Sequence, residues 1–162
     1  MIRPMISKDK SAVLRILKNT PEFTPAEVVL ADEVISDYLF NPTESGYFIL
    51  VFEMDSKIAG YVCYGPTPIT EGTWDLYWIA VDHTIQGKGI GRQLMEAAEE
   101  NIKKANGRLI LVETSSKTGY EKTNLFYQRI GYTEVCRIKD FYMIGDDQIT
   151  YEKRFTPPTS GS

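Results

Sequence analysis

Residues 79–92 read Ile-Ala-Val-Asp-His-Thr-Ile-Gln-Gly-Lys-Gly-Ile-Gly-Arg, a strand-like start that runs into a glycine-rich turn. The three glycines of the turn alternate with other residues, at Gly87, Gly89 and Gly91. Such a turn lets several backbone N–H groups point at one place, and the helix that follows adds about half a positive charge there. Lys88 and Arg92 add formal positive charge. The stretch therefore predicts an anion-binding turn suited to a pyrophosphate.

Two common nucleotide-binding motifs do not fit this turn. A P-loop needs Gly-Lys followed by Ser or Thr, but here Lys88 precedes Gly89 and no hydroxyl is placed to hold magnesium. The dinucleotide fingerprint needs Gly-x-Gly-x-x-Gly in a first βαβ unit, whereas this spacing is Gly-x-Gly-x-Gly and comes late in the chain. A glycine turn without a ligand is the alternative interpretation. The strand, the glycines, the flanking cations and the amphipathic helix together favour phosphate binding.

The composition places the chain among ordinary globular proteins. Its 162 residues fit one domain, and 43% hydrophobic with 25% charged residues is a normal balance. With 18 basic and 22 acidic residues the net charge is −4, which argues against affinity for nucleic acid, because no basic excess exists to contact phosphates. No apolar run has the length of a membrane span or of a signal peptide. We therefore expect no nucleic-acid partner and no membrane attachment.

Cysteine and histidine usage argues against a metal site. Cys63 and Cys136 are far apart and match no metal-ligand spacing, and His83 is the single histidine. Both cysteines lie in apolar, strand-like stretches, so we expect both to be buried, free thiols. A reduced, cytoplasmic setting is then the default. We interpret His83 as a solvated loop residue.

Hydrophobic periodicity and turn residues predict ten elements. Helices are predicted over residues 8–18, from Thr24 to the Asn41-Pro42 stop, over 90–104 with Gly107 ending it, and over 119–130. Strands are predicted over residues 47–53, 58–64, 74–81, 108–114, 132–138 and 148–155, the fourth of them buried on both sides.

The order of these elements predicts the fold class. It gives an α/β protein with a mixed, mostly antiparallel sheet and helices on both faces. The βαβ unit over residues 74–114 is expected to be a right-handed parallel crossover. We expect a single domain over residues 1–155. Residues 156–162, Thr-Pro-Pro-Thr-Ser-Gly-Ser, are expected to be a disordered tail or an appended segment.

Two motifs resemble those of a known superfamily. Gln86-x-x-Gly89-x-Gly91 after residues 79–81 is similar to the acyl-CoA signature of the Gcn5-related N-acetyltransferase (GNAT) superfamily. About 40 residues later, Asn-Leu-Phe-Tyr-Gln-Arg-Ile-Gly-Tyr at 124–132 resembles its Phe-Tyr-x-x-x-Gly-Phe segment. The resemblance covers residues 2–155 and implies the GNAT-like acyl-CoA N-acyltransferase fold.

The resemblance implies a set of residues that bind acetyl-CoA. The backbone of Ile79, Ala80 and Val81 would pair with the pantetheine arm like an added strand, with the N–H of Ile79 facing the thioester carbonyl. The pyrophosphate would be held by Gln86, Gly87, Lys88, Gly89, Ile90, Gly91 and Arg92. His83 stands where the superfamily commonly has proline, which loosens the turn but removes no donor.

Acid and base candidates lie at the end of one strand and on the helix that follows. Glu113 is the preferred general base, because a carboxylate at the point where a buried strand enters a loop can lie in a cleft and have a raised pKa. Its position resembles the strand-end glutamate of ribosomal-protein N-terminal acetyltransferases. Asp75 is the alternative base. Tyr127 is implied by the resemblance to be the general acid near the sulfur of coenzyme A, and Tyr120 shares its helix face.

Two further groups have open interpretations. Trp74, Tyr77 and Trp78 on one strand either pack in the core or line the acceptor cleft. The pair Asp146-Asp147 after a glycine is explained by turn chemistry, with attraction of a cationic acceptor as the alternative.

These features predict an N-acetyltransferase that moves an acetyl group from acetyl-CoA to a primary amine by direct attack in a ternary complex. No nucleophilic cysteine arrangement is present. The acceptor is a small-molecule amine or a protein amine, and the sequence does not choose between them. A non-catalytic acyl-CoA sensor of the same fold and an interaction protein with an empty turn are the alternatives. Dimers are common in the superfamily, so a homodimer is one expected state.

Overall fold

The computed structural model describes residues 1–85 and 87–156, which form two compact units. Unit 1 comprises Met1–Gly65 and Tyr77–Glu99, and unit 2 comprises Pro66–Leu76 and the described residues from Glu100 on. The single domain expected over residues 1–155 stays a prediction. The tail expected at 156–162 lies outside the described residues, apart from Thr156.

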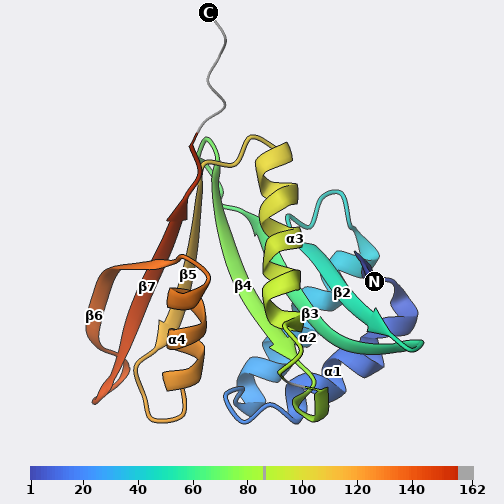
Figure 1. Cartoon of the computed structure of the whole chain (residues 1–162), viewed down its shortest axis with the longest axis horizontal. Coiled ribbons are helices and arrows are strands. Elements are labelled where there is room, and N and C mark those ends of the chain that lie inside the picture. The colour runs from blue at the N-terminus through green and yellow to red at the C-terminus, as the bar shows by residue number, and fades with distance from the viewer. Residues whose placement is uncertain (86, 157–162) are drawn as a thin grey trace, which may run out of the picture. The chain divides into compact units, whose positions relative to one another are not determined.

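The elements follow the predicted order closely (Figure 1). The helices are η1 (Ser7–Asp9), α1 (Lys10–Lys18), α2 (Pro25–Phe40), η2 (His83–Ile85), α3 (Ile90–Lys104) and α4 (Glu121–Arg129). The strands are β1 (Ile2–Pro4), β2 (Phe48–Met54), β3 (Lys57–Pro66), β4 (Thr73–Val81), β5 (Leu109–Ser115), β6 (Thr133–Met143) and β7 (Asp146–Arg154). β4 and α3 each give residues to both units.

The sheet in unit 1 has the strand order β1-β2-β3-β4. β1 pairs antiparallel with β2, where Arg3 lies opposite Val51, and β2 pairs antiparallel with β3. The β2–β3 hairpin closes through Asp55 and Ser56, both in the left-handed region, with φ of 51° and 62°. A two-residue turn with positive φ at both positions matches the twist of the strands it joins.

Helices cover both faces of this sheet, as predicted. Tyr61 and Cys63 of β3 point to the face that α1 and α2 cover, and they belong to one buried core with residues of both helices. The alternate residue Gly60 points to the other face, where a Cβ would lie 3.1 Å from Leu94 and 3.3 Å from Ile90 of α3. Figure 1 shows α3 in front of these strands and α1 and α2 behind them. Gly60 therefore marks a close approach of α3 to the sheet.

The residues at its two ends explain why α2 begins and ends where the sequence predicted. The backbone N–H of Glu27 donates to the Thr24 hydroxyl at 3.2 Å, which makes Thr24 the N-cap. Pro25 occupies the first helical position, where no N–H is needed. The helix ends at Phe40, before Asn41 and Pro42.

Unit 2 contains a sheet with the strand order β4-β5-β7-β6. Thr73–Leu76 of β4 pairs parallel with Leu109–Val112 of β5, which confirms the predicted parallel pairing. β5 pairs antiparallel with β7, and β7 with β6. The mixed, mostly antiparallel sheet that the sequence predicted is therefore present.

Burial of β5 differs from the prediction. Ile110 and Val112 are buried, but Leu109 and Leu111 on the other face are only half-buried and Glu113 is exposed. The prediction that this strand is buried on both faces is therefore wrong. Its residues are apolar on both faces, but only one face is fully buried.

The last hairpin also differs from the prediction. β6 runs to Met143 rather than 138, with a register irregularity between Ile138 and Met143 that includes Asp140 at φ 55°. β6 is an edge strand and is exposed along its whole length, so Cys136 is exposed and the expectation that it is buried is wrong. Cys63 is buried as expected.

The end of α3 corrects the assignment of Gly107. The left-handed residue after the helix is Asn106, with φ 63°, and Gly107 follows it, donating its N–H to the Ile102 carbonyl at 2.8 Å. This is the pairing of a Schellman motif. Glycine is required at position 107 because there is no room for a side chain. A Cβ there would collide with the Ile102 side chain and lie 3.0 Å from Trp74.

Two substitutions at this helix end are expected to act in opposite directions. Gly107→Ala should lower the free energy of unfolding by roughly 1–3 kcal/mol, because the added methyl overpacks the site. Asn106→Gly should raise it by up to about 1 kcal/mol, because glycine adopts positive φ without strain. Urea unfolding measures both. Equal effects of the two changes would contradict this account of the helix end.

Candidate functional site

The C-terminal part of β4 is the outer strand of unit 1. Ile79 and Val81 are half-buried and Ala80 between them is buried. The parallel pairing of β4 with β5 stops at Leu76, so the register leaves one edge of Tyr77–Val81 without a partner strand among the described residues. An edge strand offers backbone donors and acceptors to an extended ligand. This edge suits the pairing that was predicted for Ile79 to Val81.

Asp82 organises the chain directly after β4. Its N–H donates to the Ala59 carbonyl at 2.8 Å, and its carboxylate accepts from the Thr84 N–H at 3.0 Å and the Thr84 hydroxyl at 2.8 Å. These bonds, led by the one from the Thr84 backbone, keep the pKa of Asp82 below its usual value. His83 is exposed, as predicted.

The glycine turn has the backbone that an anion site requires. Gly87 and Gly89 have φ of +87° and +70°, and no atom lies within 4 Å of a Cβ built on either. Positive φ is the conformation that favours glycine, and the open space lets a ligand approach the main chain. Gln86, the predicted first residue of the cradle, lies outside the described residues.

The first amides of α3 have no acceptor inside the helix. The N–H of Gln93 donates to the Gly89 carbonyl at 3.0 Å, so the N–H groups of Ile90, Gly91 and Arg92 are the donors of the first turn that the helix itself does not pair. These N–H groups and the helix dipole favour an anion. Lys88 is exposed, and the Arg92 guanidinium forms an exposed pair with Glu96 at 3.1 Å. Such a pair contributes little, so Arg92 can exchange it for another anion.

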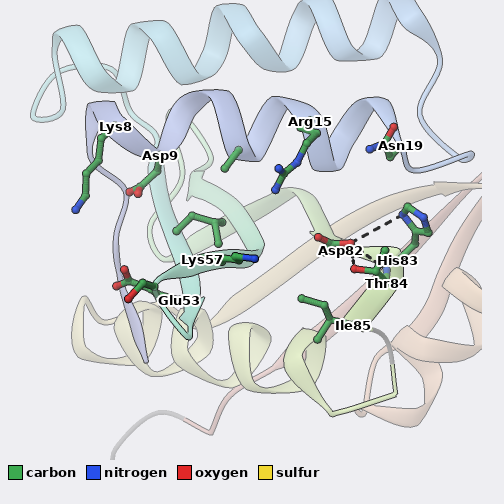
Figure 2. A pocket seen from close by; sticks show the side chains of 13 residues that line it. Lys8, Asp9, Arg15, Asn19, Glu53, Lys57, Asp82, His83, Thr84 and Ile85 are labelled. Atoms are coloured by element: carbon green, nitrogen blue, oxygen red, sulfur yellow. Dashed lines mark hydrogen bonds and ion pairs between the residues drawn. The ribbon is translucent and has the colours of Figure 1, made fainter.

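A cavity of about 660 Å³, lined mainly by charged and polar residues, lies beside the segment Asp82–Ile85 (Figure 2). Arg15 of α1 and Asn19 just after it line one wall, Lys57 at the start of β3 lines another, and Asp82–Ile85 line a third. None of the predicted coenzyme-binding residues that the structure describes lines it. This cavity is therefore distinct from the turn.

Glu113 and Asp75, the two candidate bases, both have hydrogen-bond donors in unit 2. The amide of Gln148, a buried residue, donates to a Glu113 carboxylate oxygen at 3.1 Å, and the Glu113 side chain is otherwise exposed. The Thr67 hydroxyl donates to Asp75 at 2.7 Å. Each carboxylate is thus oriented by one neutral donor.

Tyr127 is held in an aromatic cluster in unit 2. Its ring lies 5.4 Å from Phe126, 5.8 Å from Tyr132 and 6.0 Å from Tyr151, measured between ring centroids. Burial, with a smaller effect of Tyr120, raises the pKa of Tyr127 well above 10. The hydroxyl is therefore protonated at neutral pH, which is the form that donates a proton or a hydrogen bond.

Asn124 connects the helix of Tyr127 to the end of β5. Its amide oxygen accepts from the Thr114 hydroxyl at 2.7 Å and the Tyr151 hydroxyl at 3.0 Å. Its amide nitrogen donates to the carbonyls of Ser115 at 3.1 Å and Tyr120 at 2.9 Å. Asn124 belongs to the motif at residues 124–132, but the spacing of that motif does not indicate these contacts. An amide with both ends satisfied fixes α4 against β5 and so fixes Tyr127.

Glu113 and Tyr127 do not face each other. Neighbouring residues of a strand point to opposite faces, and Thr114 points toward α4 because it bonds Asn124. Glu113 therefore points away from α4, on the face opposite Tyr127. The two side chains would act on different groups and would not form a relay.

Asp146 and Asp147, the first two residues of β7, have structural partners. The Ser115 hydroxyl donates to the carboxylate of Asp146, which is 5% exposed. The N–H of Asp147 donates to the Ser116 hydroxyl at 2.7 Å, and its carboxylate accepts from the Asp140 N–H at 3.0 Å. These bonds tie the hairpin to the end of β5.

Trp74, Tyr77 and Trp78 all pack against a core, which is the first of the two interpretations. Trp74 is 7% exposed, next to Gly107 in unit 2, which is core packing. Tyr77 and Trp78 are half-buried and pack against the core of unit 1.

Two classes of site find no support in the described residues. No group of three or more His, Cys, Asp or Glu side chains is placed there to hold a metal ion. Over the same residues, 1–85 and 87–156, no helix combines the length and the apolar content that crossing a bilayer requires.

Comparison with known proteins gives a consistent result. A family model described as Acetyltransferase (GNAT) domain matches residues 45–134. A crystal structure of a protein assigned to the GNAT family from Desulfovibrio desulfuricans is 39% identical, with a TM-score of 0.92, covering 95% of this chain and 98% of that one. No curated protein sequence matches.

Two more distant structures share the fold. The ribosomal-protein-alanine N-acetyltransferase from Brucella melitensis is 23% identical with a TM-score of 0.78, and 96% of this chain and 99% of that one are covered. An aminoglycoside 6'-N-acetyltransferase complexed with coenzyme A is 17% identical with a TM-score of 0.77, covering 99% of each chain.

Burial of Tyr127 predicts an alkaline loss of stability. The raised pKa means that the folded state keeps this proton when the unfolded chain begins to lose it near pH 10. The contribution is complete below pH 10 and is lost as pH rises further. Urea unfolding between pH 7 and 11 should show a smaller alkaline loss for Tyr127→Phe than for the wild type. Tyr142→Phe, at a half-exposed tyrosine, should behave as wild type, and identical pH profiles for all three would refute the assignment.

Proposed function

Because the chain belongs to the GNAT acetyltransferase family, we propose that it transfers an acetyl group from acetyl-CoA to a primary amine. The transfer is direct, within a ternary complex. The observation that carries the proposal is the left-handed backbone at Gly87 and Gly89, followed at once by the first-turn amides of α3, which have no acceptor inside the helix. That arrangement suits a diphosphate and does not depend on particular side chains.

Acetyl-CoA would be held in unit 1 by the backbone of two adjoining segments. Ile79, Ala80 and Val81 offer an unpaired strand edge for the pantetheine arm, and the N–H of Ile79 would donate to the thioester carbonyl. Gly87 to Arg92 would surround the diphosphate, together with Gln86. The co-substrate supplies the activated acetyl group, and the protein supplies position and hydrogen bonds.

Glu113 and Tyr127 are the proposed base and acid. Glu113 would take the proton of the acceptor amine. Tyr127 would serve the departing sulfur: its pKa, raised by burial, exceeds that of an ordinary thiol near 8.5. We therefore expect it to donate a hydrogen bond to the thiolate rather than to protonate it fully. Asp75 remains the alternative base.

The need for a base depends on the acceptor. A lysine-like amine with a pKa near 10.4 costs about 4.6 kcal/mol to deprotonate at pH 7, whereas an α-amine near 8 costs about 1.4 kcal/mol. The distant structural neighbours are named for a ribosomal-protein alanine and for an aminoglycoside. Both are amine acceptors, which is consistent with either a protein or a small molecule here.

Direct transfer is supported by the chemistry of the cysteines. Burial raises the pKa of the Cys63 thiol far above neutral pH, so it is not available as a thiolate. Cys136 lies exposed on an edge strand. An acetyl-cysteine intermediate on Cys63 is therefore disfavoured. The protein is further proposed to act in the cytoplasm and as a homodimer, on the sequence arguments alone.

Gly89→Ala is the sharpest test of the turn. The added methyl strains a residue at positive φ and occupies the space through which a diphosphate would reach the main chain, so the Kd for acetyl-CoA should rise at least about tenfold. Gly119→Ala is the matched control, because Gly119 also has positive φ (+103°) and equally open surroundings but lies in unit 2. Calorimetric titration measures both. No binding to the wild type, or equal Kd values for the variants, would remove the basis of the proposal.

Kinetics separate an enzyme from an acyl-CoA sensor. Glu113→Gln should lower kcat/KM by roughly 10²–10⁴-fold if Glu113 is the base, and Tyr127→Phe should lower kcat, both with an unchanged Kd for acetyl-CoA. The assay follows thiol release with a panel of primary amines. Asp75→Asn tests the alternative base in the same assay. Coenzyme binding without transfer to any amine would identify the sensor instead.

A further inference from the structure

The cavity beside Asp82–Ile85 takes no part in the proposed coenzyme site. Its volume of about 660 Å³ is within the range of pockets that hold small organic molecules. All of its lining residues belong to unit 1. Ala12, Ile58 and Ile85 give the lining an apolar part, and most of the other residues are charged or polar. The cavity therefore has the size and the composition of a ligand site, and its charges decide which ligand it fits.

One wall of the cavity is a polar side of the first helical segment. Lysine, alanine, arginine and asparagine recur there at spacings of four, three and four residues, which places them on one side of a helix. They are Lys8 of η1, Ala12 and Arg15 of α1, and Asn19 directly after α1. The buried residues of α1 fall between these positions, on the side that packs into the core. The helix thus turns two cations and an amide toward the cavity.

The cations of the cavity have no acidic partner. The lining Lys and Arg residues are Lys8, Arg15 and Lys57, and all three are exposed. Their side-chain nitrogens form no hydrogen bond and no ion pair with residues 1–85 or 87–156. Figure 2 shows that Arg15 extends from α1 whereas Lys57 comes from the start of β3, so the charges enter from different walls. Like charges around a concave surface reinforce one another and attract an anion.

Two carboxylates of the cavity are already neutralised by a residue outside its lining. Asp9 accepts hydrogen bonds from the Arg3 guanidinium at 2.8 and 3.0 Å and from the Ile6 N–H at 2.9 Å. Glu53 accepts from the same guanidinium at 3.1 Å. Arg3 does not line the cavity. The acids at this end are therefore occupied, and they do not cancel the charge of Lys8.

Asp82 is the third carboxylate of the lining and the one that opposes an anion. Its Oδ1 atom accepts from the N–H and the hydroxyl of Thr84, at 3.0 and 2.8 Å. Local donors thus hold part of its negative charge. Three cations then remain against this single carboxylate, so the lining has an excess of positive charge.

We propose that this cavity binds a small organic anion, with a carboxylate or phosphate group between Arg15 and Lys57 and the body of the molecule against the apolar part of the lining. A guanidinium offers a planar set of donors that matches either group, and a lysine adds a mobile point charge. The bound anion is a second ligand, in addition to the coenzyme. The inference goes beyond the proposed function and does not rest on it.

Two probes test for the site, one for each anionic group. Citrate and glycerol 3-phosphate are titrated calorimetrically into protein that is saturated with coenzyme A, which keeps the glycine turn occupied. We expect saturable binding of at least one probe, with a Kd that rises as salt is added. Glycerol, the neutral counterpart of the phosphate probe, should not bind. The probe with the lower Kd identifies the preferred group. Absence of binding for both probes, or equal binding of glycerol, would overturn the proposal.

Variants locate the anion in the cavity. Arg15→Gln and Lys57→Gln should each raise the Kd of the better probe at least about tenfold, because each removes a charge that contacts the ligand. Lys18→Gln is the matched control: it removes the same charge from an exposed position of α1 that does not line the cavity. All three changes are at exposed residues, so the urea midpoints should stay close to that of the wild type. An equal rise of Kd in all three variants would show general electrostatics and overturn the assignment to the cavity.

The result is separable from the proposed function. If coenzyme A does not bind, the proposed function fails, and the comparison of the wild type with Arg15→Gln and Lys18→Gln in the absence of the coenzyme still decides on the cavity. If coenzyme A binds while Arg15→Gln and Lys57→Gln keep the wild-type Kd for the probes, the anion site fails and the proposed function stands.

Discussion

The N–H groups that an α-helix leaves unpaired in its first turn must find partners outside the helix. At the start of α3 the main-chain conformation leaves room for such a partner to be a ligand: Gly87 and Gly89 take left-handed angles, and the space beside them is open. The proposed coenzyme site is consequently a property of the backbone. Side chains such as Lys88 and Arg92 adjust its charge but do not create it, which explains why an exposed pair between Arg92 and Glu96 is compatible with binding.

The candidate chemistry of unit 2 depends on one neutral amide. Asn124 has its oxygen and its nitrogen both satisfied, and through it α4 is held to the end of β5. Tyr127 lies one helical turn further on, in a closed aromatic environment, while Glu113 points to the opposite face of the strand. Separation of the two groups suits a reaction in which one serves the incoming amine and the other the departing sulfur. It does not suit a proton relay between them.

The sequence predicted those features that depend on local chemistry. α3 spans Ile90–Lys104 as predicted, because glycines precede it and apolar residues recur at helical spacing. β1 was missed, since three residues ending in proline have no periodicity and pair only with the distant β2. The prediction that Cys136 is buried is wrong, because an apolar run does not reveal that its strand lies at the edge of the sheet. The partners of Asp146 and Asn124 depend on contacts between distant segments and cannot be read from spacing.

The contrast between the two thiols gives the protein a built-in attachment point. Cys63 is buried and its pKa is raised, whereas Cys136 is exposed on β6. A maleimide dye or a nitroxide added to the folded wild type would therefore modify one position, with no need to remove the other cysteine. Distance measurements by electron resonance or energy transfer could start from that single label, and they would report on the β6–β7 hairpin without altering any residue discussed as part of the site.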